Sequence, residues 1–372
     1  GQPYPILDEG VGLTKLPSLD LYSYDSPLEA FRLSLFKEPI NLYEWLSHLS
    51  GGFSEPYTFG ERMAVWAKNN YQNFDVVHDN QTLAYGLLKL KKLGLPVVGT
   101  IHHPITMDKR IDIKHADTLS LKILKWRWYS FLKMQIKVAR KLDPIIVVSE
   151  NTRKDLIKDF KIETKKTRKV LHGIDHETFH PIPTIKRKGN QLITTASADV
   201  PLKGLIYLIR AYAILLKEFP DLKLLVIGRL REGPTDQELK KEGIKEKVKF
   251  ISDLTGRQIA ELYAESTIAI SPSVYEGFGF PAGEAMSCGI PLISTNGGSL
   301  PEVVGDAGII VPHSNPKALK DAIKSLLDSP EKRIEFGNKG RERVLEKFTW
   351  NRAAKELVEV YREAIDNADN RP

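Results

Sequence analysis

Apolar residues follow two patterns along this chain: short runs rich in Val and Ile, and longer segments with an apolar residue every three or four positions. Short buried runs are typical of parallel strands, and the longer period is typical of helices. Their alternation indicates an α/β protein. We predict strands at 75–77, 96–101, 144–149, 168–171, 191–195, 223–228, 247–251, 267–271, 291–294 and 308–311.

The intervals between these runs carry the helical period. No repeat of fixed length and no low-complexity tract interrupts them, which sets aside solenoids and propellers. We predict helices at 58–70, 82–93, 116–141, 150–159, 205–219, 257–264, 281–287, 316–327, 330–347 and 351–366.

The strand–helix pattern forms two series, separated by an aperiodic segment at 180–190 with two prolines and a glycine, which predicts a linker. We expect two Rossmann-like doubly wound domains, 1–182 and 183–350, that face each other across a cleft. The helix at 351–372 is expected to cross back to the first domain. Ligands of such domains bind where the carboxyl ends of the strands meet. Residues 1–27 show no buried strand and no tight glycine turn, so we expect the first domain to lack its N-terminal strand.

Composition agrees with two folded domains: the chain has 372 residues, of which 42% are hydrophobic and 27% charged. Cys288 is the single cysteine, which excludes an intramolecular disulfide and a cysteine-based zinc site. This usage favours a reducing, cytoplasmic location. No apolar run approaches the ~20 residues that cross a bilayer.

The formal net charge of +7 is concentrated in the second hundred residues. Residues 121–142 contain no acid and place apolar side chains near one face, which predicts a cationic amphipathic helix. It is either an ordinary surface helix packed on the sheet or a docking element for anionic lipid at the inner membrane surface. Nucleic acid ranks last because no binding module is recognisable. The predicted docking residues are Lys122, Lys125, Trp126, Arg127, Trp128, Lys133 and Lys137.

The segment 271–289 is the richest in candidate chemistry. A strand ends near Ser271, a glycine-rich loop follows, and Pro281 begins a helix. Backbone amides at 277–282 and the positive end of this helix predict an anion site suited to a diphosphate, flanked by Glu276 and Glu284. The alternative is a tight turn with two solvated glutamates, and the glycine spacing misses the dinucleotide fingerprint.

The sequence at 276–312, EGFGFPAGEAMSCGIPLISTNGGSLPEVVGDAGIIVP, resembles the donor-site signature of retaining nucleotide-sugar glycosyltransferases of the GT-B fold, family 4. Other segments match this family in the same order, so the resemblance covers about 75–366. They are DVVHDN at 75–80, TIHHP at 100–104, IIVVSE at 145–150, VLHGIDHETFHP at 170–181, SADVPLKG at 197–204, LLVIG at 224–228 and FTW at 348–350.

The resemblance implies an enzyme that moves a hexose from a nucleotide-diphosphate sugar to a hydroxyl acceptor, either a glycan or a lipid-linked sugar, with retention. In that case Glu276 binds the sugar near the reacting carbon and Glu284 accepts hydrogen bonds from the ribose hydroxyls. The backbone amides that contact the sugar and the diphosphate are those of Gly277, Phe278, Gly279 and Phe280.

The resemblance also implies a phosphate-binding cation, Lys203, in the loop before the helix that begins near Leu205. The family often has an arginine about five residues earlier, where this chain has Ala198. We therefore consider the Ser197 hydroxyl or the Arg229 guanidinium as replacements.

In the first half of the chain, Thr100–Pro104 ends a strand on the expected cleft side. The family's histidine in this element, which contacts the donor sugar and the acceptor, maps to His102. Its neighbour His103 and the following Asp108 are candidates for the acceptor side. The alternative is a loop pair of histidines bonded only to backbone.

The sequence contains no Asp-x-Asp and no His-Glu-x-x-His, so we predict a site without metal or cofactor that binds a UDP- or GDP-linked donor. Two other functions stay open. One is a non-catalytic nucleotide-sugar-binding fragment or subunit, because the first strand and its glycine loop are missing. The other is an NAD-dependent oxidoreductase, favoured only by the glycines and the doubly wound pattern. The sequence leaves the base, the sugar, the acceptor and the linkage undetermined.

Overall fold

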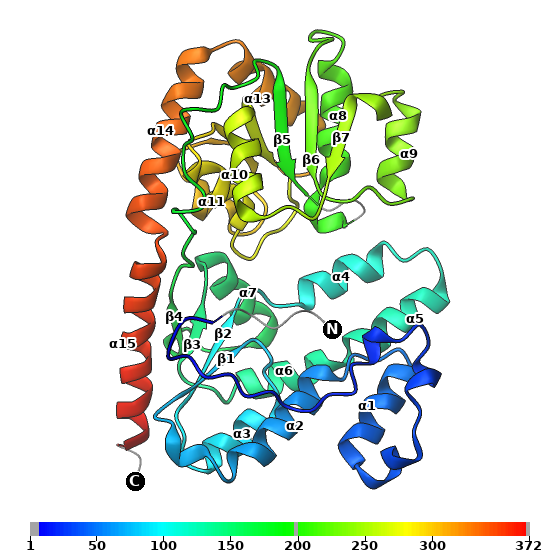
Figure 1. Cartoon of the computed structure of the whole chain (residues 1–372), viewed down its shortest axis with the longest axis vertical. Coiled ribbons are helices and arrows are strands. Elements are labelled where there is room, and N and C mark those ends of the chain that lie inside the picture. The colour runs from blue at the N-terminus through cyan, green and yellow to red at the C-terminus, as the bar shows by residue number, and fades with distance from the viewer. Residues whose placement is uncertain (1–6, 197–199, 370–372) are drawn as a thin grey trace. The chain divides into compact units, whose positions relative to one another are not determined.

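The structure, a computed structural model, describes residues 7–196 and 200–369. Its strands form a four-stranded sheet and a six-stranded sheet (Figure 1). The chain divides into two compact units. Unit 1 comprises residues 1–146, 155–168 and 359–372, and unit 2 comprises residues 147–154 and 169–358.

Every predicted strand is confirmed, with ends that differ by a few residues. The strands are β1 (Val77–Asn80), β2 (Val97–Ile101), β3 (Ile145–Val147), β4 (Thr167–Lys169), β5 (Gln191–Thr195), β6 (Lys223–Ile227), β7 (Val248–Ile251), β8 (Ile268–Ser271), β9 (Leu292–Thr295) and β10 (Ile309–Val311).

The predicted helices are also present, except that the one at 116–141 is divided. Four more were not indicated by the periodicity: α1, α4, α9 and α12. α4 buries no residue and half of the residues of α9 are charged, so neither has a clear apolar period. The helices are α1 (Pro39–Leu49), α2 (Glu55–Ala67), α3 (Tyr85–Lys92), α4 (Thr106–Lys114), α5 (Leu119–Trp128), α6 (Leu132–Ala139), α7 (Glu150–Phe160), α8 (Leu205–Leu215), α9 (Pro234–Lys241), α10 (Gly256–Glu265), α11 (Phe280–Ser287), α12 (Leu300–Val304), α13 (Pro316–Leu327), α14 (Pro330–Lys347) and α15 (Trp350–Asp369).

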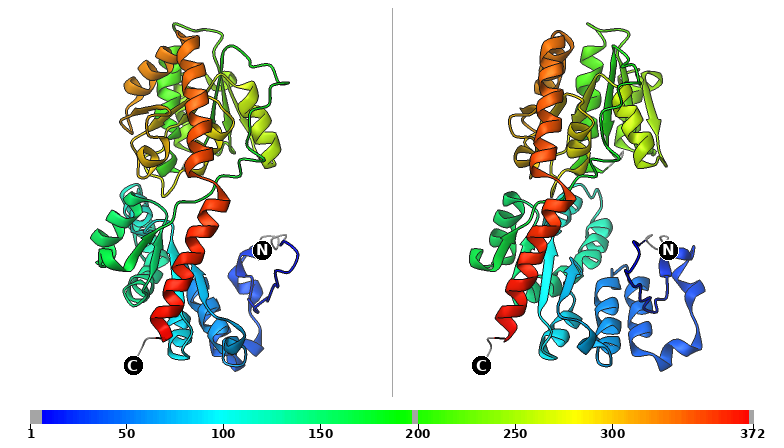
Figure 2. Two further views of the ribbon diagram at one scale, coloured as in Figure 1. Left: turned by 90° about the vertical axis from the view of Figure 1, so that its left-hand side faces the viewer. Right: turned by 60° about the vertical axis from the view of Figure 1, so that its left-hand side comes forward.

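The six-stranded sheet has the order β10-β9-β8-β5-β6-β7, and all its neighbouring strands are parallel. Alternate residues face opposite sides, as the period of a strand requires. Leu224 and Val226 of β6 pack in a core with α8 and α13, whereas Leu225 and Ile227 pack in a second core with α10, α11 and α14. Helices therefore cover both faces of this sheet (Figure 2).

The four-stranded sheet has the order β1-β2-β3-β4. β1 and β2 are parallel, with Val77 opposite Val97 and Asn80 opposite Thr100. β2 is buried along its whole length, which agrees with its continuous apolar sequence. Thr100 and Asn80 consequently lie at the same carboxyl edge of the sheet.

The basic segment is not the single helix that we predicted over 116–141. A 3-10 turn at Tyr129–Phe131 separates α5 from α6. The rings of Tyr129 and Phe131 are buried beside Phe53, and the Tyr129 hydroxyl donates to Asp112 (2.9 Å). Packing of these aromatic residues accounts for the break, because one straight helix would not bring both rings inward.

The division into units differs from our expected domain boundaries. Unit 2 begins its main segment at Lys169, so the predicted linker at 180–190 lies inside it. This segment is bonded to the rest of unit 2, since the Lys188 amide donates to the Glu265 carbonyl (2.7 Å) and Arg187 donates to the Gly289 carbonyl (2.8 Å). α15 contributes to both units, with the residues from Glu359 onward in unit 1.

Candidate active site

Two loops of unit 2 meet because their strands are neighbours. β5 and β8 are adjacent and parallel, so the loops that follow them leave the same sheet edge. The Leu202 carbonyl accepts hydrogen bonds from the amides of Val274 (2.8 Å) and Tyr275 (3.4 Å). Gly204 has φ +62°, and a Cβ atom there would lie 2.2 Å from the Pro272 carbonyl oxygen. A glycine is therefore required where the two loops touch.

This contact brings together two of the predicted site residues. Lys203 Nζ donates to Glu276 Oε1 at 2.8 Å, and the Ser273 hydroxyl donates to the same oxygen at 2.7 Å. The Glu276 side chain is 12% exposed and that of Lys203 is 31% exposed. The ammonium and the carboxylate thus form a pair at the surface of the site, where a ligand phosphate would compete for the ammonium.

The segment that begins with Glu276 of this pair, Glu276–Phe280, is named the donor loop. Its first three carbonyl groups are all bonded to serine. The Glu276 carbonyl accepts from the Ser299 amide (3.0 Å) and hydroxyl (3.1 Å), and the Phe278 carbonyl accepts from the same hydroxyl (2.7 Å). The Gly277 carbonyl accepts from the Ser149 hydroxyl (3.1 Å).

The amides of the donor loop are unbonded, in contrast to its carbonyls. Within the described part of the chain, the N–H groups from Gly277 to Phe280 donate to no protein acceptor. Gly279 has φ +104° and precedes α11, whose first N–H groups have no partner within the helix. The donor loop therefore presents a row of amide donors at a helix N-terminus, the arrangement that binds phosphate in many α/β proteins.

Ser299 did not stand out in the sequence analysis, although it follows two glycines and lies two residues before a proline. Gly298 has φ +62°, and a Cβ atom there would lie 2.2 Å from the Glu276 carbonyl oxygen. The close approach of the 297–299 turn is what places the Ser299 hydroxyl between two donor-loop carbonyls. The signal in the sequence is the Gly-Gly-Ser turn before the short helix α12.

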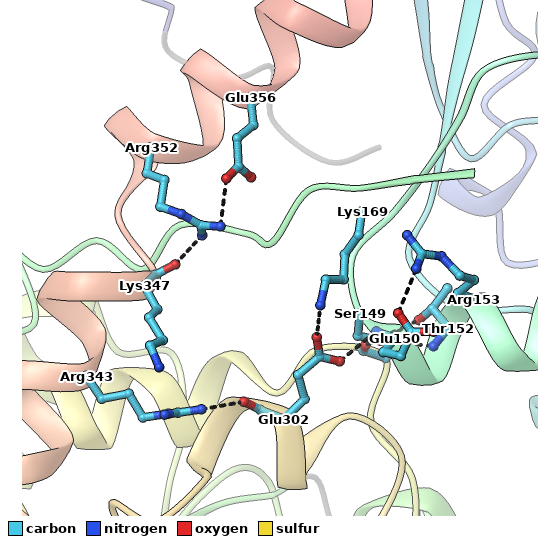
Figure 3. A network of polar contacts seen from close by, with 11 residues as sticks. Ser149, Glu150, Thr152, Arg153, Lys169, Glu302, Arg343, Lys347, Arg352 and Glu356 are labelled. Carbon is cyan, nitrogen blue, oxygen red and sulfur yellow. Dashed lines mark hydrogen bonds and ion pairs between the residues drawn. The ribbon is translucent and has the colours of Figure 1, made fainter. Parts of the chain in front are cut away.

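Ser149, the other serine that supports the donor loop, lies in a segment, residues 149–153, that a polar network holds in place (Figure 3). The Glu302 carboxylate of α12 accepts from the Glu150 amide (2.6 Å) and from Lys169 Nζ (2.8 Å). Arg343 of α14 donates to the Glu302 carbonyl (2.9 Å). The start of α7, where Ser149 lies, is thereby connected to the helix that follows Ser299.

Glu284, the second predicted carboxylate, lies in α11. Burial, with a smaller contribution from the charge of Asp175, raises the pKa of Glu284 to about 7 from its usual 4.5. A carboxyl group that is expensive to ionise is stabilised when ligand hydroxyls donate to it. This environment is compatible with the predicted role toward ribose hydroxyls.

An aromatic cluster that the sequence analysis did not predict surrounds the donor loop. The His172 ring stacks on Phe280 with centroids 5.2 Å apart, and it meets Phe278 edge-on at 5.2 Å. Phe278 is buried against Phe348, whereas Phe280 is 39% exposed. Phe278 and Phe280 are therefore the side chains by which the cluster anchors the donor loop.

The two replacements that we considered for the missing arginine stay predictions. Arg229 is paired with Asp253 (2.7 Å) and is largely exposed. The alternative, Ser197, lies outside the described residues, as does Ala198. Lys203 is the predicted cation that contacts the donor loop, through Glu276.

In unit 1, His102 follows β2 and is held by two polar contacts. Its amide donates to Gln81 Oε1 (2.6 Å), and its Nε2 lies 2.7 Å from Asn80 Oδ1. Burial lowers the pKa of His102, with smaller contributions from His103 and His78. The ring is consequently neutral near pH 7. His103 Nε2 lies 3.0 Å from Asp108 Oδ2, so the two acceptor-side candidates are bonded to each other.

The predicted docking residues have two different environments. Lys125 pairs with Asp112 (2.8 Å), Arg127 donates to Ser47 (3.0 Å), and the Trp128 ring stacks on Phe53 (5.0 Å). These three side chains are engaged within unit 1. Trp126 has Lys109 over its ring (3.9 Å) and is still 57% exposed. The remaining members of the set, all on the surface, are Lys122, Lys133 and Lys137.

The described residues contain neither a cluster of metal ligands nor a helix that could span a membrane. No group of three or more His, Cys, Asp or Glu side chains in 7–196 or 200–369 is placed to hold a metal ion. No helix over the same ranges is long and apolar enough to span a membrane.

Two α/β sheets, with a glycine-rich loop at a helix N-terminus on the second, are the architecture of the GT-B fold. Solved structures confirm the fold. Sucrose-phosphate synthase from Thermosynechococcus elongatus superimposes with a TM-score of 0.67 at 20% identity, covering 83% of this chain and 78% of that one. Anabaena Alr3699/HepE in complex with UDP-glucose gives 0.65 at 17% identity, covering 83% of each chain.

Sequence comparison identifies the family. Residues 21–178 match the model "Glycosyltransferase Family 4", and residues 176–343 match "Glycosyl transferases group 1". An MMP alpha-(1->4)-mannosyltransferase of Mycolicibacterium hassiacum is 40% identical over 373 residues, covering 98% of this chain and 89% of the relative. The chain belongs to glycosyltransferase family 4, and it is a glycosyltransferase.

The role of Ser299 is tested by Ser299→Ala. Loss of its hydroxyl leaves two donor-loop carbonyls short of a donor, so we expect nucleotide-diphosphate affinity to fall about tenfold. Isothermal titration measures this change. The control is Ser266→Ala, which removes a buried hydroxyl bonded to the Leu262 carbonyl (2.7 Å) before β8. Equal affinities for both variants would contradict the role.

The environment of Glu284 predicts a pH dependence of stability. Between about pH 4.5 and 7 the folded protein holds a proton that the unfolded chain has released, so the free energy of unfolding falls as pH rises. Glu284→Gln removes this dependence. The free energy of unfolding of Glu284→Gln, relative to that of wild type, should increase by about 3 kcal/mol between pH 4.5 and pH 8.

Urea unfolding at several pH values measures this difference. The control is Glu342→Gln, which alters an exposed carboxylate of α14. Parallel pH profiles for Glu284→Gln and wild type would show that the carboxyl group is not buried as described.

Proposed function

We propose that this chain transfers a hexosyl residue, mannose being the first to test, from a nucleotide-diphosphate sugar to a glycan hydroxyl, with retention and without a metal ion. The observation that carries this proposal is the Lys203–Glu276 pair (2.8 Å) at the end of the row of unbonded donor-loop amides. An ammonium beside several N–H donors is suited to a diphosphate, and a carboxylate beside them is suited to sugar hydroxyls.

The relatives support the choice of donor. The name of the Mycolicibacterium hassiacum relative, at 40% identity, is that of an α-(1→4)-mannosyltransferase. The Anabaena protein was solved with UDP-glucose. We infer a UDP- or GDP-linked hexose as donor. Coverage of 89% of a catalytic relative favours an enzyme over a non-catalytic fragment, and membership of the family leaves the oxidoreductase alternative without support.

The proposed chemistry needs no nucleophile from the protein. The bond between the anomeric carbon and the phosphate oxygen breaks while the acceptor oxygen bonds to the same face of that carbon. The acceptor's proton passes to the departing phosphate oxygen. Lys203 and the donor-loop amides offset the charge that develops on the leaving diphosphate. The neutral His102 ring can hydrogen-bond to a hydroxyl group without adding charge.

Replacement of the cation tests this proposal. Lys203→Ala should lower kcat/KM for transfer by about 10²–10³, because a preorganised charge on the leaving group is lost. The assay uses a panel of nucleotide sugars, with EDTA present because we propose a metal-independent reaction. Lys245→Ala is the matched control, since Lys245 also pairs with a carboxylate of unit 2, Asp236 (2.8 Å).

Two results would contradict the proposal. One is a Lys203→Ala enzyme as active as Lys245→Ala. The other is wild-type transfer that EDTA abolishes and a divalent cation restores, since the ammonium would then not be the group that neutralises the diphosphate.

A second proposal is peripheral contact of α5 with an anionic membrane, on the cytoplasmic side. α5 buries no residue, and its exposed apolar side chains include Leu119 (75%) and Ile123 (61%). Exposed apolar groups beside lysines are characteristic of interfacial helices.

Vesicle co-sedimentation tests this contact. Wild-type protein should bind vesicles that contain anionic lipid more strongly than neutral ones, and Ile123→Asp should weaken this binding about tenfold. Ile334→Asp, at another exposed isoleucine (66%) on α14, is the control. Equal binding to neutral and anionic vesicles would exclude the contact.

A further inference from the structure

Unit 1 contains a cavity of about 460 Å³ that no sequence motif indicates. It is lined by the segment Thr14–Ser18, by Glu44 in the middle of α1 and by residues in the first half of α2, and we name it the α1–α2 pocket. Its volume is within the range of small-ligand sites. The segment before α1 runs beside both helices (Figures 1 and 2).

The charges that line the α1–α2 pocket balance. Lys15 and Arg62 contribute two cations, and Glu44 and Glu55 contribute two carboxylates. Arg62 and Glu44 form an ion pair with side chains 9% and 3% exposed, and Arg62 also donates to Asn41 Oδ1 (2.6 Å). The pocket therefore has fixed polar groups but no net charge, which fits an uncharged ligand better than a phosphate.

One of these carboxylates is available to a ligand. Within the described residues, the Glu55 carboxylate makes no hydrogen bond or ion pair. Partial burial, followed by the charges of Glu44 and Asp20, raises its pKa. Glu55 is an exposed residue of the pocket lining, so its carboxylate can accept hydrogen bonds from ligand hydroxyls in place of water.

The remaining lining combines hydroxyl groups with apolar surface. The exposed Ser18 can exchange hydrogen bonds with ligand hydroxyls, whereas Thr58 is 1% exposed and donates to the Glu55 carbonyl (3.4 Å). Phe59 offers a ring that is 43% exposed. A sugar ring has hydroxyl groups around its rim and apolar C–H faces, so it needs both kinds of partner. Carboxylates, hydroxyls and an exposed aromatic ring supply them together.

The α1–α2 pocket is connected to His102, at the carboxyl edge of the four-stranded sheet. Thr82, which lines it, donates to the Asp79 carboxylate at the end of β1. The preceding residue, Gln81, holds both histidines: it accepts from the His102 amide (2.6 Å) and donates to the His103 carbonyl (2.8 Å). The pocket wall and the support of His102 thus belong to one short loop.

From these observations we propose that the α1–α2 pocket is a subsite for the uncharged oligosaccharide acceptor, holding sugar units beyond the one that reacts. This inference rests on the proposed function, because it assumes a glycan acceptor. It predicts that acceptor length matters: short acceptors end before the pocket, and longer ones reach it.

The test compares Phe59→Ala and Glu55→Gln with Glu61→Gln. Glu61 lies on the same helix but pairs with Lys89, outside the pocket. With neutral manno- and gluco-oligosaccharides of increasing length, we expect the acceptor KM of Phe59→Ala to rise about tenfold for the longer ones only. Glu55→Gln should raise it severalfold, and Glu61→Gln should match wild type. Thermal unfolding verifies that each variant is folded.

Direct titration of the longest oligosaccharide into donor-free protein separates this proposal from the proposed function. Binding that Phe59→Ala weakens supports the pocket even if no transfer is detected. If wild type transfers the sugar and both pocket variants, Phe59→Ala and Glu55→Gln, keep the wild-type acceptor KM, the pocket proposal is overturned and the proposed function is not. Tighter binding of a phosphorylated oligosaccharide than of its neutral counterpart also overturns it, because the balanced charges of the pocket favour an uncharged ligand.

Discussion

The orientation of the donor-loop peptide groups is the constraint on which the candidate site depends. Each carbonyl from Glu276 to Phe278 is turned toward a serine hydroxyl, so the adjoining N–H groups point elsewhere and find no protein acceptor in the described chain. Donors left unbonded are costly unless water or a ligand satisfies them. The peptide groups of the loop are thus oriented before a ligand binds, which is the preorganisation that the proposed diphosphate site requires.

Support for this orientation is distributed over elements that are distant in sequence. Ser149 comes from the start of α7, Ser299 from the turn before α12, and Glu302 connects the two through the Glu150 amide. Lys203 arrives from the loop after β5 because β5 and β8 are neighbours. The parallel sheet therefore does more than provide a core: its strand order determines which loops can contribute groups to the phosphate site that we propose.

Much of this arrangement could be predicted from sequence. All strands followed from apolar runs, and Pro281 and the glycines located the loop before α11. What escaped prediction depends on contacts distant in the chain. Ser299 has a role only because Gly298 lets its turn approach Glu276, and the break between α5 and α6 follows from rings that pack on Phe53. Periodicity also missed α9, whose polar residues are held by ion pairs such as Arg210–Glu238 (2.9 Å).

A crystal structure with an intact nucleotide-diphosphate hexose would test the central claim most directly. The account predicts phosphate oxygens within about 3.2 Å of the Gly279 and Phe280 amides. It also predicts that Lys203 Nζ turns from Glu276 to the phosphate, while the serine contacts to the loop carbonyls persist. A diphosphate bound elsewhere, with the Lys203–Glu276 pair intact and the donor-loop amides facing solvent, would contradict it.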